Sequence, residues 1–117
     1  MEIIEGTDNP GTKSRRSSDS SMVGAQIGLL VKSRQGRDKG RYYLVVGIES
    51  ETIVRVADGD LRRVESPKRK NIRHIKSCGL IASEIQEKAI DGKRITNADV
   101  RKGLKSLLEE LESEIYP

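Results

Sequence analysis

The two residues of this sequence best suited to covalent chemistry are His74 and Cys78, which lie four positions apart. A cysteine nucleophile needs a base within hydrogen-bonding distance. If the segment is a β-strand, residues four apart lie roughly 13 Å from each other, which is too far for proton transfer. One histidine and one cysteine also cannot supply the ligands of a zinc site. We therefore expect no enzyme activity, no metal and no cofactor, and we expect Cys78 to be a small buried apolar residue.

The composition also restricts where the protein acts. No apolar run approaches the roughly 20 residues that span a bilayer, and residues 1–11 do not resemble a secretory signal. The single cysteine cannot form an internal disulfide, which fits a reducing compartment. We expect a cytoplasmic protein with no membrane partner.

Positive charge is concentrated in the middle of the chain. Residues 27–78 contain 13 basic and six acidic residues, a net charge of +7, whereas residues 1–26 carry −1 and residues 79–117 carry −2. A local excess of this size raises the concentration of polyanions near the surface, RNA above all. The plainer alternative is a charged surface that only keeps the protein in solution.

The first candidate RNA-binding group is the turn at residues 35–41. Gly36 and Gly40 allow the backbone to turn sharply and to approach a phosphate, while Arg37, Lys39 and Arg41 supply the charge. A free carboxylate would repel RNA, so we expect the intervening Asp38 to pair with a nearby arginine or to cap a backbone amide. Alternatively, the glycines only close a hairpin.

The second group lies between residues 68 and 76, where five of nine residues are basic. Lysine and arginine neutralise phosphates, and arginine also stacks on exposed bases. We predict RNA contacts from Arg62, Lys68, Arg69, Lys70, Asn71, Arg73, His74 and Lys76. We also expect that replacing residues 68–70 with glutamate abolishes RNA binding without unfolding the protein. A charged surface strand is the alternative, in which His74 only binds a backbone carbonyl.

Short β-branched runs separated by turn residues predict the elements that position these groups. We expect five strands, at residues 27–33, 41–48, 52–57, 61–65 and 72–76, with a hairpin turn at 58–60 and a basic loop at 68–71. Strand alternation predicts that one of Tyr42 and Tyr43 points into the core. Five short strands joined by tight turns suggest a small closed or half-open barrel.

The flanking segments have other patterns. Residues 13–21 contain no apolar residue, so residues 1–21 are predicted to be a disordered tail, with Met22 as an alternative start. We assign residues 22–78 to the barrel and 79–117 to a helical extension. A helix is predicted over residues 80–90, and another from Thr96 onward, where Thr96 and Asp99 resemble a capping box. Its apolar stripe comprises Val100, Leu104, Leu107, Leu108 and Leu111. This stripe packs on the barrel, on the first helix or on a partner.

The middle segment resembles the KOW motif of ribosomal and transcription-factor proteins. The matching residues begin with Ile27-Gly28, Val31 and Ser33 and continue through Gly36-Arg37-Asp38-Lys39-Gly40-Arg41 and Leu44-Val45-Val46. Further matches follow at Val56-Ala57-Asp58-Gly59, Leu61-Arg62, Pro67-Lys68-Arg69-Lys70-Asn71 and His74-Ile75. They are similar to bacterial KOW-domain RNA-binding proteins and, through them, to archaeal and eukaryotic large-subunit ribosomal proteins. The resemblance implies a mainly β, SH3-like barrel that contacts RNA, ribosomal RNA in particular, through its loops.

We therefore expect a non-catalytic RNA-binding protein of the translation apparatus, whose C-terminal helices contact ribosomal proteins. The alternatives are a regulator that binds other RNA, or an adaptor in a transcription or translation complex. SH3-like modules that bind proline-rich or methylated peptides use aromatic grooves or cages. This chain has three tyrosines, no tryptophan and no phenylalanine, which disfavours that class of module.

Overall fold

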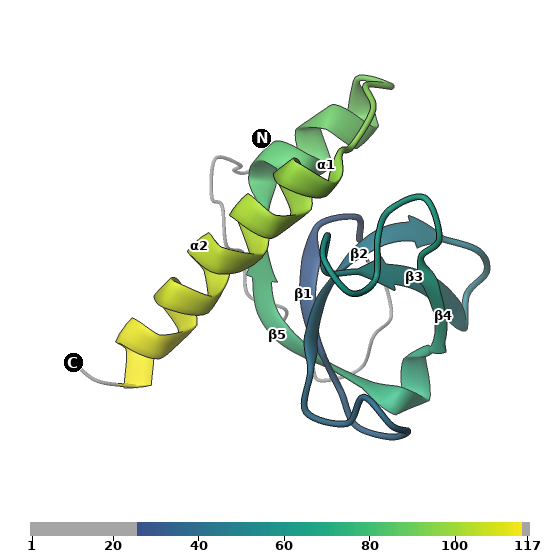
Figure 1. The fold of residues 1–117 in the computed structure, drawn as a ribbon, viewed down its shortest axis with the longest axis vertical. Helices are drawn as coiled ribbons and strands as arrows, with labels where there is room; N and C mark the ends of the chain where they lie inside the picture. Colours follow the sequence, from purple (N-terminus) through teal and green to yellow (C-terminus); the bar gives the residue numbers. More distant parts are fainter. Residues whose placement is uncertain (1–25, 116–117) are drawn as a thin grey trace, which may run out of the picture.

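A computed structural model describes residues 26–115 of the chain, and their side chains as far as residue 113 (Figure 1). The predicted tail at residues 1–21 lies outside this range. The elements are β1 (Leu29–Ser33), β2 (Tyr42–Ile48), β3 (Ile53–Ala57), β4 (Lys68–Asn71), η2 (Ile72–His74), β5 (Ile75–Ile81), α1 (Ser83–Ile90) and α2 (Asn97–Ile115).

The strands form one five-stranded antiparallel sheet in the order β4-β3-β2-β1-β5, which confirms a sheet followed by two C-terminal helices. Figure 1 shows that the sheet is strongly curled. The register shifts once between β1 and β5 and once between β2 and β3, and such irregularities bend the strands that contain them. The two edge strands, β4 and β5, do not pair with each other.

Both faces of β1 and most of β2 are covered, because successive side chains alternate between two apolar clusters. Leu29, Val31, Tyr43 and Val45 belong to the inner cluster, on the concave face. Leu30 and Leu44 belong to the other cluster, which the helices complete. This arrangement explains why β1 and β2 contain nearly continuous apolar runs. It also confirms that one tyrosine of the pair, Tyr43, points into the core.

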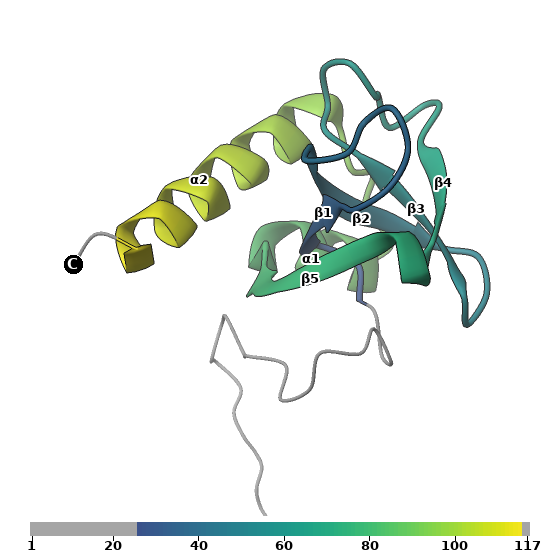
Figure 2. The ribbon, with the colours of Figure 1, turned by 90° about the horizontal axis from the view of Figure 1, so that it is seen from below.

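The helices cover the outer face of the sheet (Figure 2). Val100 and Leu107 of α2 are buried there, which confirms that the predicted apolar stripe packs on the sheet. Gly103 permits this close approach, since a Cβ atom at this position would lie 3.3 Å from Ala82 Cβ and 3.4 Å from Leu44 Cδ1. Glycine at this position therefore relieves a tight contact between α2 and the sheet, which offsets its low helix propensity.

The predicted capping box at the start of α2 is confirmed. The Asp99 amide donates to Thr96 Oγ1 over 3.1 Å, and the Thr96 amide donates to Asp99 Oδ2 over 2.9 Å. Lys88 of α1 also donates to Asp99 Oδ2 over 2.8 Å. The hydrogen bonds from Lys88 and from the Thr96 backbone lower the pKa of Asp99 to about 2. Asp99 thus ties the two helices together.

The predicted strand at residues 61–65 is wrong, because this segment is a loop. Its amides bond to side chains instead of a neighbouring strand, which is how aspartate and asparagine compete with regular structure. Asp58 Oδ1 accepts from the Arg62 amide over 2.8 Å, and Asn97 Oδ1 accepts from the Val64 amide over 2.8 Å.

Three other boundaries also differ from the predictions. The predicted basic loop at residues 68–71 is strand β4, which pairs with β3 so that Lys70 stands opposite Val54. The predicted strand at 72–76 begins only at Ile75, because Asn71 Oδ1 accepts from the Arg73 amide over 2.9 Å and caps the short helix η2. Strand β5 then continues to Ile81, so the first helix begins at Ser83, not at residue 80.

Gly59 is a position where only glycine fits. Its φ is +78°, and a Cβ atom there would lie 2.5 Å from the Asn97 carbonyl oxygen at the start of α2. Gly92 has a similar φ of +71°, but a Cβ atom there would meet nothing within 4 Å. We expect Gly92→Ala to cost about 1 kcal/mol of unfolding free energy from backbone strain alone. Gly59→Ala adds the steric clash and should cost at least about 1 kcal/mol more. Urea unfolding of both variants measures the difference, and equal losses would contradict this role of the α2 contact.

Candidate nucleic-acid interface

The loop between β1 and β2, which carries the first predicted RNA-binding group, is held to the sheet by Asp38. This residue is 7% exposed, although it lies in a loop of otherwise exposed side chains. Asp38 Oδ2 accepts from the Tyr43 hydroxyl over 2.7 Å, and Asp38 Oδ1 accepts from the Ser33 hydroxyl over 2.9 Å. The expectation that Asp38 pairs with a nearby arginine or caps an amide is wrong, since its charged partners are lysines about thirty positions away.

Those lysines come from β4. Lys70 Nζ donates to Asp38 Oδ1 over 3.0 Å, to Ser33 Oγ over 3.1 Å and to the Gln35 carbonyl oxygen over 3.1 Å. An ammonium group has three donors, so Lys70 has none left for a ligand, and it is only 7% exposed. Lys68 Nζ donates to Asp38 Oδ2 over 3.0 Å from a more exposed position.

Electrostatics keep Asp38 charged in this buried position. Burial by itself would raise the pKa of the carboxyl, but hydrogen bonds from Tyr43, Lys70, Lys68 and Ser33 outweigh it and hold the pKa well below the ordinary value. The same contact acts in the other direction on the tyrosine. Burial, together with the hydrogen bond to Asp38, raises the pKa of Tyr43 to about 12. The network is therefore a fixed charged unit at neutral pH.

Because Asp38 points inward, its neighbours on the loop point outward. Arg37, Lys39 and Arg41 are all exposed. The backbone turns at Gly36, with φ +96°, and at Gly40, with φ +93°. Three hydrogen bonds hold this turn: the amides of Lys39, Gly40 and Arg41 donate to the carbonyl oxygens of Gly36, Ser33 and Asp38 respectively. The predicted loop thus presents three cations on a fixed backbone.

Of the other predicted residues, His74 borders this loop, because its carbonyl oxygen accepts from the Arg34 amide over 2.8 Å, and Lys76 stands opposite Lys32 near the end of β1. Arg69 is exposed on β4 and donates to Glu49 Oε1 over 2.8 Å, and this hydrogen bond lowers the pKa of Glu49. Arg62 is half-buried, with a long 3.4 Å contact to the Ser66 carbonyl oxygen. Asn71 caps η2 as described, His74 is half-buried, and Arg73 and Lys76 are exposed.

Ion pairing separates the basic residues of this segment into two groups. On the β3–β4 side, Arg55 and Arg69 pair with Glu49, Arg63 pairs with Glu65, and Lys68 and Lys70 pair with Asp38. Within the described residues, no ion pair involves the cations of the β1–β2 loop, of η2 or of the start of β5. Their positive charge is therefore available to a ligand.

Sequence reasoning missed two further cations in this second group, Lys32 and Arg34. Lys32 stands directly opposite Lys76 on the neighbouring strand β5 and opposite Tyr42 on β2. Its Nζ lies 5.4 Å from the centroid of the Tyr42 ring. Arg34 is exposed at the start of the loop. The signal was present in the sequence, because alternation from the buried Val31 places Lys32 on the outer face of β1.

Three further findings concern the alternatives weighed above. Burial raises the pKa of the Cys78 thiol, which is half-buried against the helix-side cluster, so it is not an activated nucleophile. Among residues 26–115, no group of three or more candidate ligands could hold a metal ion. No helix in the described part of the chain is both long and apolar enough to cross a membrane.

Comparison with known proteins gives one informative similarity. The chain is 41% identical, over 54 residues, to a protein of Bacillus subtilis (strain 168) named "Putative ribosome-binding protein YbzG". The aligned region covers 46% of this chain and 73% of the Bacillus subtilis protein. No protein-family model matches the chain.

The buried Asp38 network should stabilise the fold strongly. Asp38→Asn removes the charge that balances the Lys70 ammonium, and breaking a buried pair in this way costs about 3 kcal/mol. Because the folded-state pKa of Asp38 is lowered, its contribution is complete above the ordinary pKa of about 3.9 and is lost as the pH falls through the folded value. Urea unfolding should therefore show a large difference between the variant and the wild type at pH 7 and a smaller one at pH 3.

Asp60→Asn is the matched control, since Asp60 is exposed and no ion pair involves it within the described residues. This variant should unfold like the wild type at both pH values. A loss of stability in Asp38→Asn no greater than that of the control would show that the network does not hold the loop.

Proposed function

Because this chain belongs to the same protein family as YbzG of Bacillus subtilis, we propose that it is a ribosome-associated protein that binds RNA and catalyses no reaction. The relative's name concerns ribosome binding only. RNA as the ligand is our inference from the cations that no ion pair of residues 26–115 neutralises, since ribosomal RNA presents a dense array of phosphates. A cytoplasmic location is part of this proposal.

We further propose that the curled sheet is an SH3-like barrel of the KOW type. Two observations support this proposal. The first block of residues that resembles the KOW motif, residues 27–46, covers β1, the β1–β2 loop and most of β2. In addition, the sheet curls around its own apolar cluster, as a small barrel does.

The observation that carries the RNA-binding proposal is the fixed β1–β2 loop with its outward cations. Asp38 and Lys70 hold the loop in place, so Arg37, Lys39 and Arg41 need little reordering to meet a phosphate backbone, which favours binding. Lys32, Arg34, Arg73 and Lys76 extend the positive surface beyond the loop. We assign Lys70 a positioning role and not a contact with RNA.

The positioning role of Lys70 makes the triple glutamate variant of residues 68–70 a poor test of RNA contacts. Replacing Lys68, Arg69 and Lys70 together with glutamate would leave Asp38 without its cations and surround it with carboxylates. We therefore now expect that triple variant to lose stability as well as RNA binding, so it cannot separate the two effects. Variants at exposed and unpaired cations can.

The double variant Lys39→Glu/Arg41→Glu should bind purified Bacillus subtilis ribosomes at least about tenfold more weakly than the wild type at low salt, because each lost phosphate contact removes counterion release. The salt dependence of binding should also become shallower. Ribosome co-sedimentation at several salt concentrations measures both effects.

Lys93→Glu/Arg94→Glu is the matched control, since it makes the same change in charge in the connection between α1 and α2. Both residues are exposed, and this connection lies at the opposite end of the molecule from the β1–β2 loop (Figure 1). If the control weakens ribosome binding as much as the loop variant does, net charge decides binding and the interface assignment is wrong.

Lys32 and Lys76 stand directly opposite each other on β1 and β5. Like charges directly opposite on neighbouring strands repel each other, so Lys76→Gln should raise the unfolding free energy by roughly 0.5 kcal/mol. The same substitution should weaken ribosome binding, because it removes an unpaired cation. A variant that is more stable but binds less well indicates that this lysine serves the ligand. Unchanged binding in the more stable variant would exclude Lys76 from the interface.

A further inference from the structure

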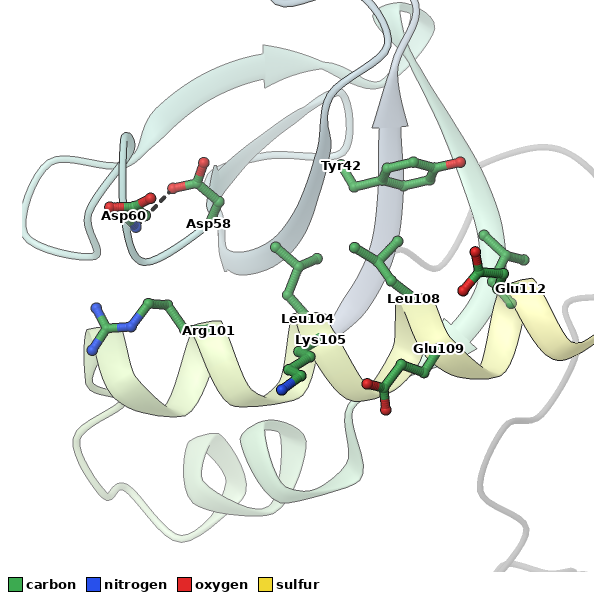
Figure 3. Close-up of a pocket in the computed structure, with 10 residues that line it drawn as sticks. Tyr42, Asp58, Asp60, Arg101, Leu104, Lys105, Leu108, Glu109 and Glu112 are labelled. Carbon is green, nitrogen blue, oxygen red and sulfur yellow. Dashed lines mark hydrogen bonds between the residues drawn. The ribbon is translucent and has the colours of Figure 1, made fainter.

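A groove with a volume of about 600 Å³ lies between α2 and the sheet (Figure 3). Its floor is apolar. Tyr42, Leu104, Leu108 and Leu111 line it, and all four are only partly buried at the margin of the helix-side cluster. In Figure 3, Leu104 and Leu108 point from α2 toward Tyr42 and the sheet. The groove therefore offers apolar surface that the fold itself does not cover.

The rim of the groove is acidic, whereas residues 27–78, which contain most of the sheet, carry a net charge of +7. Four carboxylates line it, from Asp58, Asp60, Glu109 and Glu112, against two cations, from Arg101 and Lys105. Two of these groups also form hydrogen bonds within the chain. The Arg101 guanidinium donates to the Gly59 carbonyl oxygen over 2.7 Å, and Asp58 Oδ1 accepts from the Asp60 and Arg62 amides. The chain as a whole carries a net charge of +4, so this region has the opposite polarity to the molecule.

Glu109 and Glu112 are the most available of these carboxylates. They lie three positions apart on α2, so they are neighbours on the helix surface. Both are exposed, and no ion pair involves either of them within the described residues. Asp60 is also exposed, on the opposite side of the groove. A ligand in the groove would meet leucine side chains below and negative charge on both sides.

We propose that this groove binds a basic, leucine-containing segment of a protein partner. The apolar side chains of the segment fill the groove, and its lysines or arginines pair with the acidic rim, as when an amphipathic helix binds in a groove. RNA does not fit this surface, because the rim would repel phosphates. The inference goes beyond RNA binding and does not depend on it, since the two surfaces have opposite charge.

The test uses the full chain labelled with nitrogen-15 and a short synthetic peptide made of Leu-Lys-Lys-Leu repeats. A peptide of Leu-Glu-Glu-Leu repeats has the same apolar pattern and the opposite charge. We expect the basic peptide to shift amide signals of residues 58–60 and 101–112, and the acidic peptide to leave them unchanged. Glu109→Lys/Glu112→Lys should weaken binding of the basic peptide about tenfold, because it reverses two rim charges.

The loop variant Lys39→Glu/Arg41→Glu is the matched control, and it should bind the basic peptide at least as tightly as the wild type does. The rim variant should in turn retain ribosome binding if RNA alone carries that interaction. The proposal is overturned if both peptides bind equally, if the shifted signals lie outside the groove, or if the rim variant binds the basic peptide unchanged. Failure of the ribosome-binding test would leave these peptide results unaffected, so the two proposals can fail separately.

Discussion

The ion pair between Asp38 and Lys70 is the constraint on which the candidate interface depends. A charge buried without a partner would be costly, yet here a carboxylate and an ammonium neutralise each other, and a serine, a tyrosine and a carbonyl oxygen complete their hydrogen bonds. The pair connects the loop after β1 to the edge strand β4, which lies more than thirty positions later in the chain. Any conformation that moves the loop away from β4 would leave a buried charge unpaired. The conformation of the exposed cations is therefore set by residues that do not themselves face a ligand.

The position of this network follows from the two-sided burial of the sheet. Lys68 and Lys70 stand opposite Val56 and Val54 on β3, so strand alternation directs them toward the inner apolar cluster. An ammonium can occupy such a position only when an anion meets it there, and Asp38 supplies that anion at the margin of the cluster. On the outer face the same alternation places Leu30 and Leu44 beneath the helices and leaves Lys32 beyond them. One physical rule, the alternation of side chains along a strand, thus separates positioning lysines from available ones.

The sequence predicted the larger features of the fold, because these depend on local patterns. β-branched runs identified three of the strands, the leucine stripe identified α2, and the Thr96–Asp99 spacing identified its cap. The errors arose where distant residues decide the structure. Residues 61–65 have the alternation of a strand, but Asn97, more than thirty positions away, takes one of their amides. From the sequence alone, Lys70 is expected to be a surface cation, because its partner Asp38 lies more than thirty positions away. No local pattern contains that information.

The same limitation applies to the candidate site, for which counting basic residues was a poor guide. Arg69 and Arg55 both pair with Glu49, and Lys68 and Lys70 pair with Asp38, so much of the positive charge on β3 and β4 is neutralised within the chain. A neutralised cation contributes little to phosphate binding, because it must first give up its own partner. The repulsion between Lys32 and Lys76, by contrast, is not relieved by any ion pair of the described residues, and it costs stability that the fold would regain from a polar residue at either position. A repulsion that the fold does not relieve is a better indication of an anionic ligand than the abundance of lysine and arginine. On that criterion the proposed RNA-binding surface lies on the side of β1 and β5 and includes the β1–β2 loop.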